Sequence, residues 1–263
     1  MDKTKIVVIL GIRNERSLAF AIAKKMNELK YQIAINYMAD SKDEVMYHCE
    51  KEGIHVSFAS EVDVRNENQL TAFLKQVHSQ LGPIDYILHS VAFGSNKVLC
   101  NKLPFSDEKI PEYIDIPLDE LQEAIDIGAY SLLRLCRLAR PYLAKSASFL
   151  TTTYNASQRV MPKYAGMAIV KACLENIVKY LAYHLGKEGH RVNALSPGLV
   201  MTTSAASISG VRKLRKQSAE ASPLGNISAE DVAEAAAYYF SAASKKVSGN
   251  IHYIDGGLNI MGG

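Results

Sequence analysis

The stretch Ser148-Phe-Leu-Thr-Thr-Thr-Tyr154, followed after a short loop by Tyr164-Ala-Gly-Met-Ala-Ile-Val-Lys171, decides the fold of this chain. An apolar run of strand length comes first, and a long helical pattern, predicted over Lys163–Leu185, comes second. Another buried strand, Val192–Leu195, follows the helix. A strand, a helix and a second strand in this order form the repeating unit of a parallel sheet. We therefore expect an α/β protein.

The same alternation of strand and helix extends over the whole chain. The predicted strands are Lys5–Leu10, Gln32–Tyr37, His55–Ser60, Tyr86–His89, Ser148–Thr153, Val192–Leu195 and Asn250–Ile254. Helical patterns include Lys42–Glu52, Asp119–Leu143, Lys163–Leu185 and Asp231–Ala242, while Phe93–Pro117 reads as a long irregular segment. The pattern predicts a single domain over residues 1–263, with a doubly wound, Rossmann-type parallel sheet of seven strands and helices on both faces. A small-residue loop and a short helix are expected near residues 197–221.

Composition excludes several classes of function. The 263 residues are 48% apolar and 22% charged, and the net charge of +3 is too small to indicate nucleic-acid or membrane binding. No apolar run approaches the ~18 residues of a membrane span. The four cysteines are widely spaced and the seven histidines show no ligand-like pairing. We expect a soluble, cytoplasmic protein without disulfides or a metal ion.

Tyr164 and Lys171 are the candidate reactive pair. Seven residues are about two helical turns, which would place the two side chains roughly 10 Å apart on one face. A phenol can donate a proton or a hydrogen bond, and a neighbouring ammonium favours its anion. This pairing suits carbonyl chemistry beside a nicotinamide. The spacing alone is weak evidence, because three other tyrosine–lysine pairs share it: Tyr180/Lys187, Tyr238/Lys245 and Tyr239/Lys246. Only Tyr164 and Lys171 lie between a strand end and a second buried strand.

Three strand ends are candidates for binding a dinucleotide. Gly11 and Ser17 join the first strand to its helix, where dinucleotide folds bind a pyrophosphate on helix N–H groups, although an ordinary turn with a serine cap is the alternative. Asp63 follows the third strand and could accept from an adenine amino group, or form a simple surface turn. The small residues after His89 would let a backbone approach the cofactor ribose. His89 itself is expected to be a packed residue.

The end of the second strand bears on the choice of cofactor. An NADP site would require an arginine or lysine there for the 2′-phosphate, whereas an acid suits a free 2′-hydroxyl. Met38 occupies the expected position and Asp40 is close, although Lys42 follows. We therefore expect NADH to be preferred.

Together these motifs resemble the short-chain dehydrogenase/reductase superfamily, and within it the bacterial NADH-dependent enoyl-acyl-carrier-protein reductases. The chain lacks the T-G-x3-G-x-G turn and the N-A-G strand end of ordinary members. Like the enoyl reductases, it has a single Gly11 followed six residues later by Ser17-Leu-Ala, and His89-Ser-Val-Ala-Phe after the fourth strand. Tyr154, ten residues before Tyr164, is similar to the tyrosine pair of that family. The resemblance covers essentially the whole chain.

The resemblance implies a reaction and a set of roles. Hydride would pass from NADH to the β-carbon of a trans-2-enoyl thioester, carried by acyl carrier protein, in fatty-acid synthesis. Tyr164 would bond the thioester carbonyl and stabilise the enolate, Lys171 would hold the nicotinamide ribose, and Tyr154 would line the acyl site, with Gly94 touching the substrate. The resemblance also assigns the dinucleotide site to a set of residues at the strand ends: Gly11, Ile12, Ser17, Leu18, Met38, Asp63, Val64, Ser90, Val91, Ala92, Lys171, Val200, Met201 and Thr202.

Some residues depart from that family and leave alternatives open. Pro197-Gly198-Leu199 stands where the family usually has Ala-Gly-Pro, and it is closer to ordinary ketoreductases. A carbonyl reductase of the same superfamily is therefore one alternative, also favoured by Thr151, which lies thirteen residues before Tyr164, where ordinary members place a serine. A dinucleotide-sensing protein without chemistry is an alternative of another class. Met201 and Thr203 also differ from the residues common in the family.

Two expectations concern partners. The short basic helix with Arg212, Lys213, Arg215 and Lys216 is either a solvated face or a docking site for acidic acyl carrier protein. The resemblance also implies a homotetramer that assembles through the two long helices, Asp119–Leu143 and Lys163–Leu185.

Overall fold

A computed structural model describes residues 4–101, 109–161, 164–206 and 210–262. Seven strands in these parts of the chain form one parallel sheet in the order β3-β2-β1-β4-β5-β6-β7. This confirms the predicted fold class and number of strands. The strand bounds are β1 Ile6–Leu10, β2 Gln32–Tyr37, β3 Val56–Glu61, β4 Ile84–His89, β5 Leu143–Thr152, β6 Arg191–Pro197 and β7 Ile251–Ile254.

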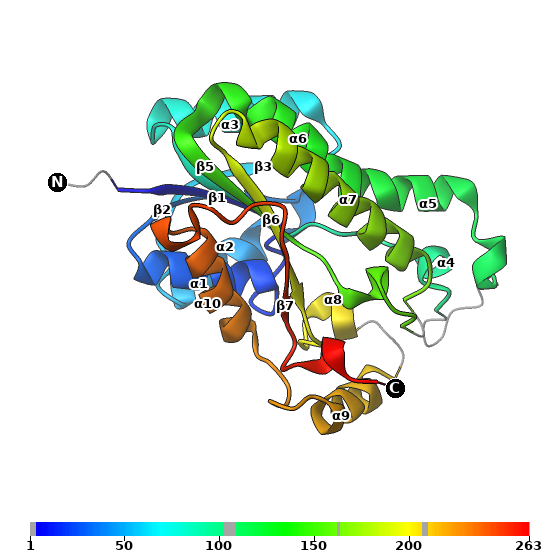
Figure 1. Cartoon of the computed structure of the whole chain (residues 1–263). Coiled ribbons are helices and arrows are strands. Elements are labelled where there is room, and N and C mark those ends of the chain that lie inside the picture. Colours follow the sequence, from blue (N-terminus) through cyan, green and yellow to red (C-terminus); the bar gives the residue numbers. More distant parts are fainter. Residues whose placement is uncertain (1–3, 102–108, 162–163, 207–209, 263) are drawn as a thin grey trace.

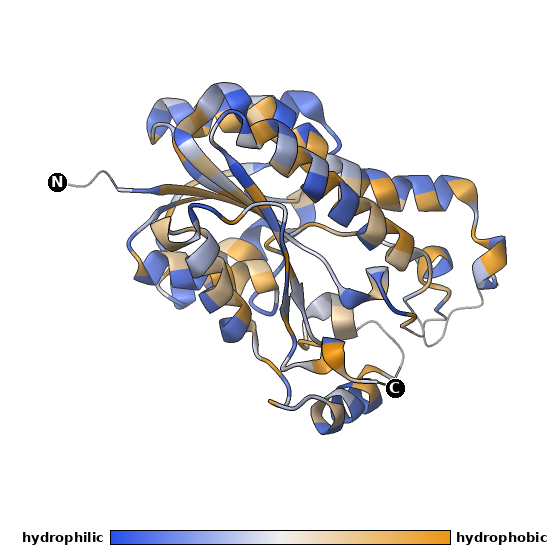
Figure 2. Cartoon of the chain, viewed as in Figure 1, coloured by the Kyte–Doolittle hydropathy of each residue, from blue (hydrophilic) through white to orange (hydrophobic). Residues whose placement is uncertain are grey.

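Helices cover both faces of the sheet (Figure 1). The helix bounds are α1 Leu18–Glu28, α2 Lys42–Lys51, α3 Glu67–Gln80, α4 Asn96–Leu99, α5 Leu118–Ile125, α6 Ser131–Ala139, α7 Gly166–Gly186, α8 Thr203–Ala206, α9 Val211–Ala221 and α10 Ala229–Tyr239. Side chains of β1 alternate between two cores. Val7 and Ile9 pack with α1, α2 and α10, while Ile6, Val8 and Leu10 pack with α3, α6 and α7. Figure 2 shows β1 coloured as apolar along its length, and apolar residues alternating with polar ones on the helices.

The predicted long helix over Asp119–Leu143 is wrong in its continuity and its end. The structure has α5, then a π-helical turn over Asp126–Tyr130, then α6, which ends at Ala139. Pro141 explains the end, because it has no N–H to donate to the preceding turn. Leu143 therefore begins β5, five residues before the predicted start of that strand.

Three other predicted segments differ in detail. The helix predicted over Lys163–Leu185 begins at Gly166, and its first predicted residue lies outside the described part of the chain. The irregular segment Phe93–Pro117 contains α4 and a 3-10 turn, Tyr113–Asp115, and residues 102–108 are not described. The small-residue stretch Pro197–Gly210 contains α8, with residues 207–209 outside the description.

None of the helices in the described ranges is long and apolar enough to cross a membrane.

The sheet changes its direction of winding between β1 and β4, and the ends of these strands meet closely. Ser90 donates its N–H to the carbonyl of Leu10 across 3.0 Å. Gly11 has φ +102°, and a Cβ atom at this position would lie 2.1 Å from the carbonyl oxygen of Ser90. Ligands of doubly wound sheets bind in the crevice at this point. Gly11 therefore sets how closely the two strand ends approach beneath the ligand.

This close approach predicts an unequal cost for two glycine substitutions. Gly11→Ala should lower the free energy of unfolding by on the order of 3 kcal/mol, because it adds a backbone clash to an unfavourable φ. Gly53→Ala is the matched control, since Gly53 has φ +67° and open space around its Cβ position. It should cost about 1 kcal/mol. Denaturant unfolding measures both, and equal losses would contradict the close approach.

Candidate active site

A buried amide connects three of the strand ends at which the sequence predicts a dinucleotide site. The N–H of Gly11 donates to Asn36 Oδ1 across 3.0 Å, and Asn36 Nδ2 donates to the carbonyl of Val62 across 3.0 Å. One side chain thus ties the ends of β1, β2 and β3 together. Our sequence analysis missed Asn36, although a polar residue inside the apolar run Gln32–Tyr37 was a usable signal.

The first turn of α1 has free N–H groups toward the crevice. Ser17 occupies the N-cap position, but its side chain makes no capping hydrogen bond. Its hydroxyl instead donates to the carbonyl of Asn14 across 2.7 Å. Helix N–H groups without a side-chain cap form a ready anion site, which is how a pyrophosphate binds. The predicted capping role of Ser17 is therefore wrong, whereas a phosphate site at this helix end fits the geometry.

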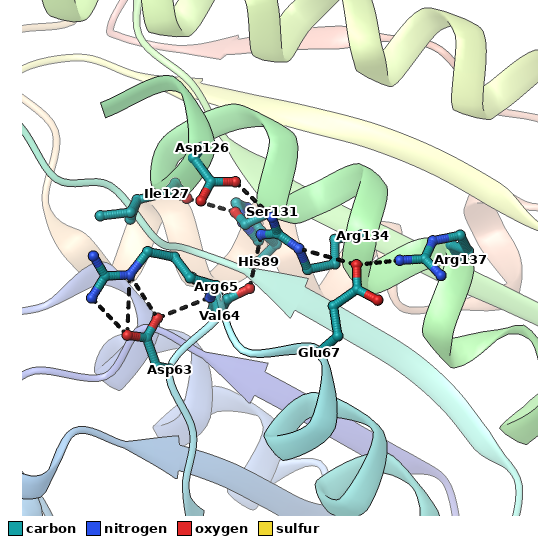
Figure 3. A network of polar contacts seen from close by, with 10 residues as sticks. All are labelled: Asp63, Val64, Arg65, Glu67, His89, Asp126, Ile127, Ser131, Arg134 and Arg137. Atoms are coloured by element: carbon teal, nitrogen blue, oxygen red, sulfur yellow. Dashed lines mark hydrogen bonds and ion pairs between the residues drawn. The ribbon is translucent and has the colours of Figure 1, made fainter. Parts of the chain in front are cut away.

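Asp63 and Val64 lie in a polar network at the end of β3 (Figure 3). The Asp63 carboxylate accepts from Nε and Nη2 of Arg65, at 3.1 and 2.7 Å, and this partner lowers its pKa. The carbonyl of Val64 accepts from Arg134, which also pairs with Asp126 across 2.7 Å. Asp63 is thus held as an anion beside the crevice, and its role as an adenine ligand stays a prediction.

The end of β4 brings small residues against α7. Ser90 Oγ lies 3.3 Å from Thr152 Oγ1 at the end of β5. Gly94, further along the same segment, packs against the first turn of α7. A Cβ atom at this position would lie 2.6 Å from the sulfur of Met167. The segment Ser90–Gly94 therefore forms a wall of the crevice that tolerates little added volume.

Tyr154 and Tyr164 lie against each other. Their ring centroids are 4.9 Å apart and the ring planes meet at 58°. Burial raises the pKa of both phenols, and for Tyr164 the neighbouring Tyr154 raises it further. Both hydroxyls are therefore protonated at neutral pH and can donate hydrogen bonds. The structure brings together the pair that the sequence singled out.

Tyr164 is not on the helix that carries Lys171. It precedes α7 by two residues, and Ala165 between them has φ +34° and ψ −118°, a backbone conformation that L residues rarely adopt. The expected placement of Tyr164 and Lys171 two turns apart on one helix is therefore wrong in its geometry. A strained junction sets the direction of Tyr164 instead, and such junctions are common beside functional residues.

Lys171 is a buried cation at the end of β5. Only 4% of the residue is exposed, and its ammonium donates to the carbonyl of Thr152 across 3.0 Å. Burial lowers the pKa of Lys171 to about 8, while the carboxylate of Glu175 opposes this change. The ammonium has three protons, so two remain for other acceptors such as sugar hydroxyls.

His89 is a packed residue, as expected. Its ring nitrogens lie 2.9 Å from Thr151 Oγ1 and 2.8 Å from Ser131 Oγ, and the Ser131 hydroxyl also donates to the carbonyl of Ile127 across 2.5 Å (Figure 3). Burial, with the charge of Lys171, lowers the pKa of His89 to about 3, so its ring is neutral. Thr151 is fully buried, and its hydroxyl oxygen also lies 2.9 Å from the carbonyl oxygen of His89. It is committed to this network.

A comparison with known families decides the assignment. The profile of the family described as enoyl-(acyl carrier protein) reductase matches residues 11–259, which is nearly the whole chain. The chain belongs to this family.

Similar reductases extend over the full length. The NADH-dependent enoyl-acyl-carrier-protein reductase FabI of Rickettsia felis is 35% identical over 97% of this chain and 94% of its own. The FabI protein of Synechocystis is 31% identical over 98% of this chain and 97% of its own. The crystal structure of the NADH-dependent reductase of Aquifex aeolicus matches with a TM-score of 0.89 at 30% identity, over 98% of both chains.

Cofactors are present in two similar solved structures. The reductase of Anaplasma phagocytophilum was solved with NAD and matches with a TM-score of 0.88 at 30% identity, over 98% of this chain and 93% of its own. That of Bacillus cereus was solved with NADP+ and indole naphthyridinone, and matches with a TM-score of 0.91 at 29% identity, over 98% of this chain and 97% of its own.

Further predicted residues of this reductase lie on three loops, after β1, β2 and β6. Met38 is half-exposed at the end of β2, and Ile12 is buried beside Gly11. Val200, Met201 and Thr202 are partly exposed after β6, where the N–H of Thr202 donates to the carbonyl of Val200 across 2.8 Å. The structure therefore places all three loops at the carboxyl ends of the strands, with the rest of the site.

Proposed function

We propose that this member of the family reduces trans-2-enoyl thioesters on acyl carrier protein in fatty-acid synthesis, with NADH as reductant. The observation that carries the proposal is the contact between the partly buried rings of Tyr154 and Tyr164, together with the buried Lys171, whose ammonium is bonded to Thr152 just before Tyr154. Two neutral phenols supply hydrogen-bond donors, and one cation supplies positive charge. Reduction of an enoyl thioester needs this combination, because negative charge develops on the thioester oxygen.

The residues at the strand ends fit a nicotinamide dinucleotide. The free N–H groups at the start of α1 suit a pyrophosphate, and Gly11 leaves room for its backbone approach. Two protons of the Lys171 ammonium are available for the nicotinamide ribose hydroxyls. When bound, NADH supplies the hydride that reaches the β-carbon of the substrate.

The protein groups act on the charge that develops on the substrate. Tyr164 donates a hydrogen bond to the thioester carbonyl, which takes on enolate character as the β-carbon is reduced. Its raised pKa keeps the phenol protonated for this role. Lys171 stabilises the same negative charge through space, and Tyr154 orders the acyl end of the site through its contact with Tyr164. The α-carbon takes its proton after the enolate has formed.

The structure argues against carbonyl reduction as the main activity. Thr151 occupies the position where ordinary members of the superfamily place a serine, but its hydroxyl is committed to His89. It is fully buried and so is not offered to a substrate. Tyr154 supplies a second phenol against Tyr164, which favours the enoyl thioester.

Parallel assays of NADH oxidation test the proposed reaction. Crotonyl-acyl carrier protein should be reduced and an acetoacetyl thioester should not. Tyr164→Phe should lower turnover of the enoyl substrate at least tenfold, because one missing donor to a developing oxyanion costs this much or more. Tyr47→Phe, which alters an exposed tyrosine on α2, is the matched control and should leave turnover unchanged. Activity with the ketone alone would identify a carbonyl reductase, and tight NADH binding without turnover would favour a sensing protein.

The preference for NADH rests on an ion pair at the adenosine end. Nη1 and Nη2 of Arg13 lie 3.1 and 3.0 Å from the two carboxylate oxygens of Asp40. The pair joins the loop after β1 to the turn after β2, where dinucleotide folds hold the ribose 2′ group. Asp40 repels a 2′-phosphate and occupies the guanidinium of Arg13, which could otherwise bind it. Our sequence analysis missed Arg13.

Removing the charge of Asp40 should release Arg13 for a phosphate. Asp40→Asn should tighten NADPH binding about tenfold or more, because arginine pairs well with phosphate oxygens. The dissociation constant for NADPH can be measured by nucleotide fluorescence. Asp43→Asn is the matched control, since it removes the same charge nearby on an exposed face of α2. An equal gain in both variants, or a gain that survives Arg13→Ala, would contradict the ion-pair account.

We propose that the basic helix α9 docks acyl carrier protein. A surface depression beside the loop that follows β6 is lined by Met201, Arg212, Arg215, Lys216 and Asn226. Asn226 holds the helix in place by donating to the carbonyl of Arg215 across 3.2 Å. The exposed cations next to the site suit an acidic carrier.

We further propose a cytoplasmic homotetramer that buries the exposed rings of Tyr130, Tyr180 and Tyr183.

Charge reversal on α9 separates carrier docking from catalysis. Arg215→Glu combined with Lys216→Glu should raise KM for crotonyl-acyl carrier protein about tenfold and leave KM for crotonyl-coenzyme A nearly unchanged. The effect should shrink with added salt, because exposed charges are screened. As a control, Lys245→Glu combined with Lys246→Glu reverses two exposed cations that precede β7, at the amino ends of the strands. Equal increases for both thioesters would contradict docking.

A further inference from the structure

Glu175 is a buried carboxylate that the proposed reaction does not use. It lies on α7 one turn after Lys171, and only 3% of the residue is exposed. Its Oε1 accepts hydrogen bonds from Thr153 Oγ1 at 2.8 Å and Ser157 Oγ at 2.6 Å. Its Oε2 accepts from Gln158 Nε2 at 3.0 Å. An ionised carboxylate is costly to bury, so three donors at one site indicate a specific requirement for it.

All three donors belong to the segment that carries Tyr154. Thr153 directly precedes Tyr154, while Ser157 and Gln158 end the 3-10 turn that follows it. The N–H of Thr153 donates to the carbonyl of Leu195 on β6, and the N–H of Ser157 donates to the carbonyl of Tyr154. The segment thus has backbone anchors of its own, and Glu175 adds a link from it to the helix of Lys171. Glu175 therefore connects the segment that carries Tyr154 to the helix that carries Lys171.

We propose that Glu175 is a positioning residue for the reductase site, which holds the Tyr154 segment against α7 and keeps Lys171 charged. The proposal rests on the proposed function, because it concerns the same tyrosine and lysine. Packing by an apolar side chain could serve the first task. Only a negative charge one turn from a buried ammonium serves the second.

The groups that surround Lys171 leave Glu175 as its source of negative charge among the described residues. His89 on β4 is neutral, and the phenols of Tyr154 and Tyr164 are protonated. Tyr253 on β7 interacts with Glu175, and burial raises its pKa, so it adds no charge at neutral pH. The carboxylate raises the pKa of Lys171 against the effect of burial. Its removal must then lower that pKa further.

The sign of the pH dependence follows from this. Lys171 acts as a cation, so activity and NADH binding fall as pH rises through its pKa of about 8. Glu175→Gln nearly keeps the shape of the side chain and removes its charge. The alkaline fall should then move to lower pH by about one unit. Below that fall, the variant should retain kcat/KM within a few-fold of the parent protein. Glu175→Asp keeps the charge but shortens the reach, so it should lower kcat while the fall stays in place.

The experiment measures two pH profiles between about pH 6 and 9.5: kcat/KM with crotonyl-acyl carrier protein, and NADH affinity by nucleotide fluorescence. Glu188→Gln is the matched control, because it removes a carboxylate just beyond the far end of the same helix. A Glu175→Gln profile that superimposes on the parent profile after scaling would leave Glu175 a merely structural residue and overturn the proposal. An equal shift in the Glu188→Gln control would also overturn it. If the parent protein did not reduce the thioester, the proposed function would fail, and the NADH affinity profile would still test Glu175.

Discussion

The buried ammonium of Lys171 is the constraint on which the rest of the site depends. It donates to the carbonyl of Thr152, so the helix that carries it cannot move away from the end of β5. The Tyr154 segment continues from the same strand, and Glu175 joins that segment back to the helix. A buried cation needs acceptors and counter-charge around it, and these partners hold the segment that carries Tyr154, against which Tyr164 packs. The chemistry and the local fold therefore rest on one charge.

The seven strands and their parallel sheet could be predicted because each buried strand is a short apolar run between turn residues, and helical patterns lie between most of them. The π-helical turn between α5 and α6 could not, since the residues Asp126–Tyr130 continue the helical pattern without a break. Tertiary packing explains it: a Cβ atom at Gly128 would lie 2.7 Å from Val170, directly beside Lys171. The junction at Ala165 was equally hidden, because nothing in its residue type indicates a positive φ.

The candidate site was predictable where a residue type carries its own chemistry, as with Tyr154, Tyr164 and Lys171. Residues whose role comes from a partner distant in sequence were missed. Glu175 reads as one more acid on a long helix, and Arg13 as one more surface cation, until the structure places them beside Thr153 and Asp40. Thr151 shows the reverse case. Its position matched the serine of ordinary superfamily members and favoured a carbonyl reductase, but the partner that occupies its hydroxyl, His89, is 62 residues away along the chain.

The fate of the transferred hydrogen tests the central claim most directly. NADH carrying deuterium at the transferable C4 position should be used to reduce crotonyl-acyl carrier protein, and the product analysed by mass spectrometry and NMR. The account predicts a butyryl thioester with one deuterium on the β-carbon and a solvent proton on the α-carbon. Deuterium on the carbinol carbon of a hydroxyacyl product from the acetoacetyl thioester, with no label in any butyryl product, would contradict it.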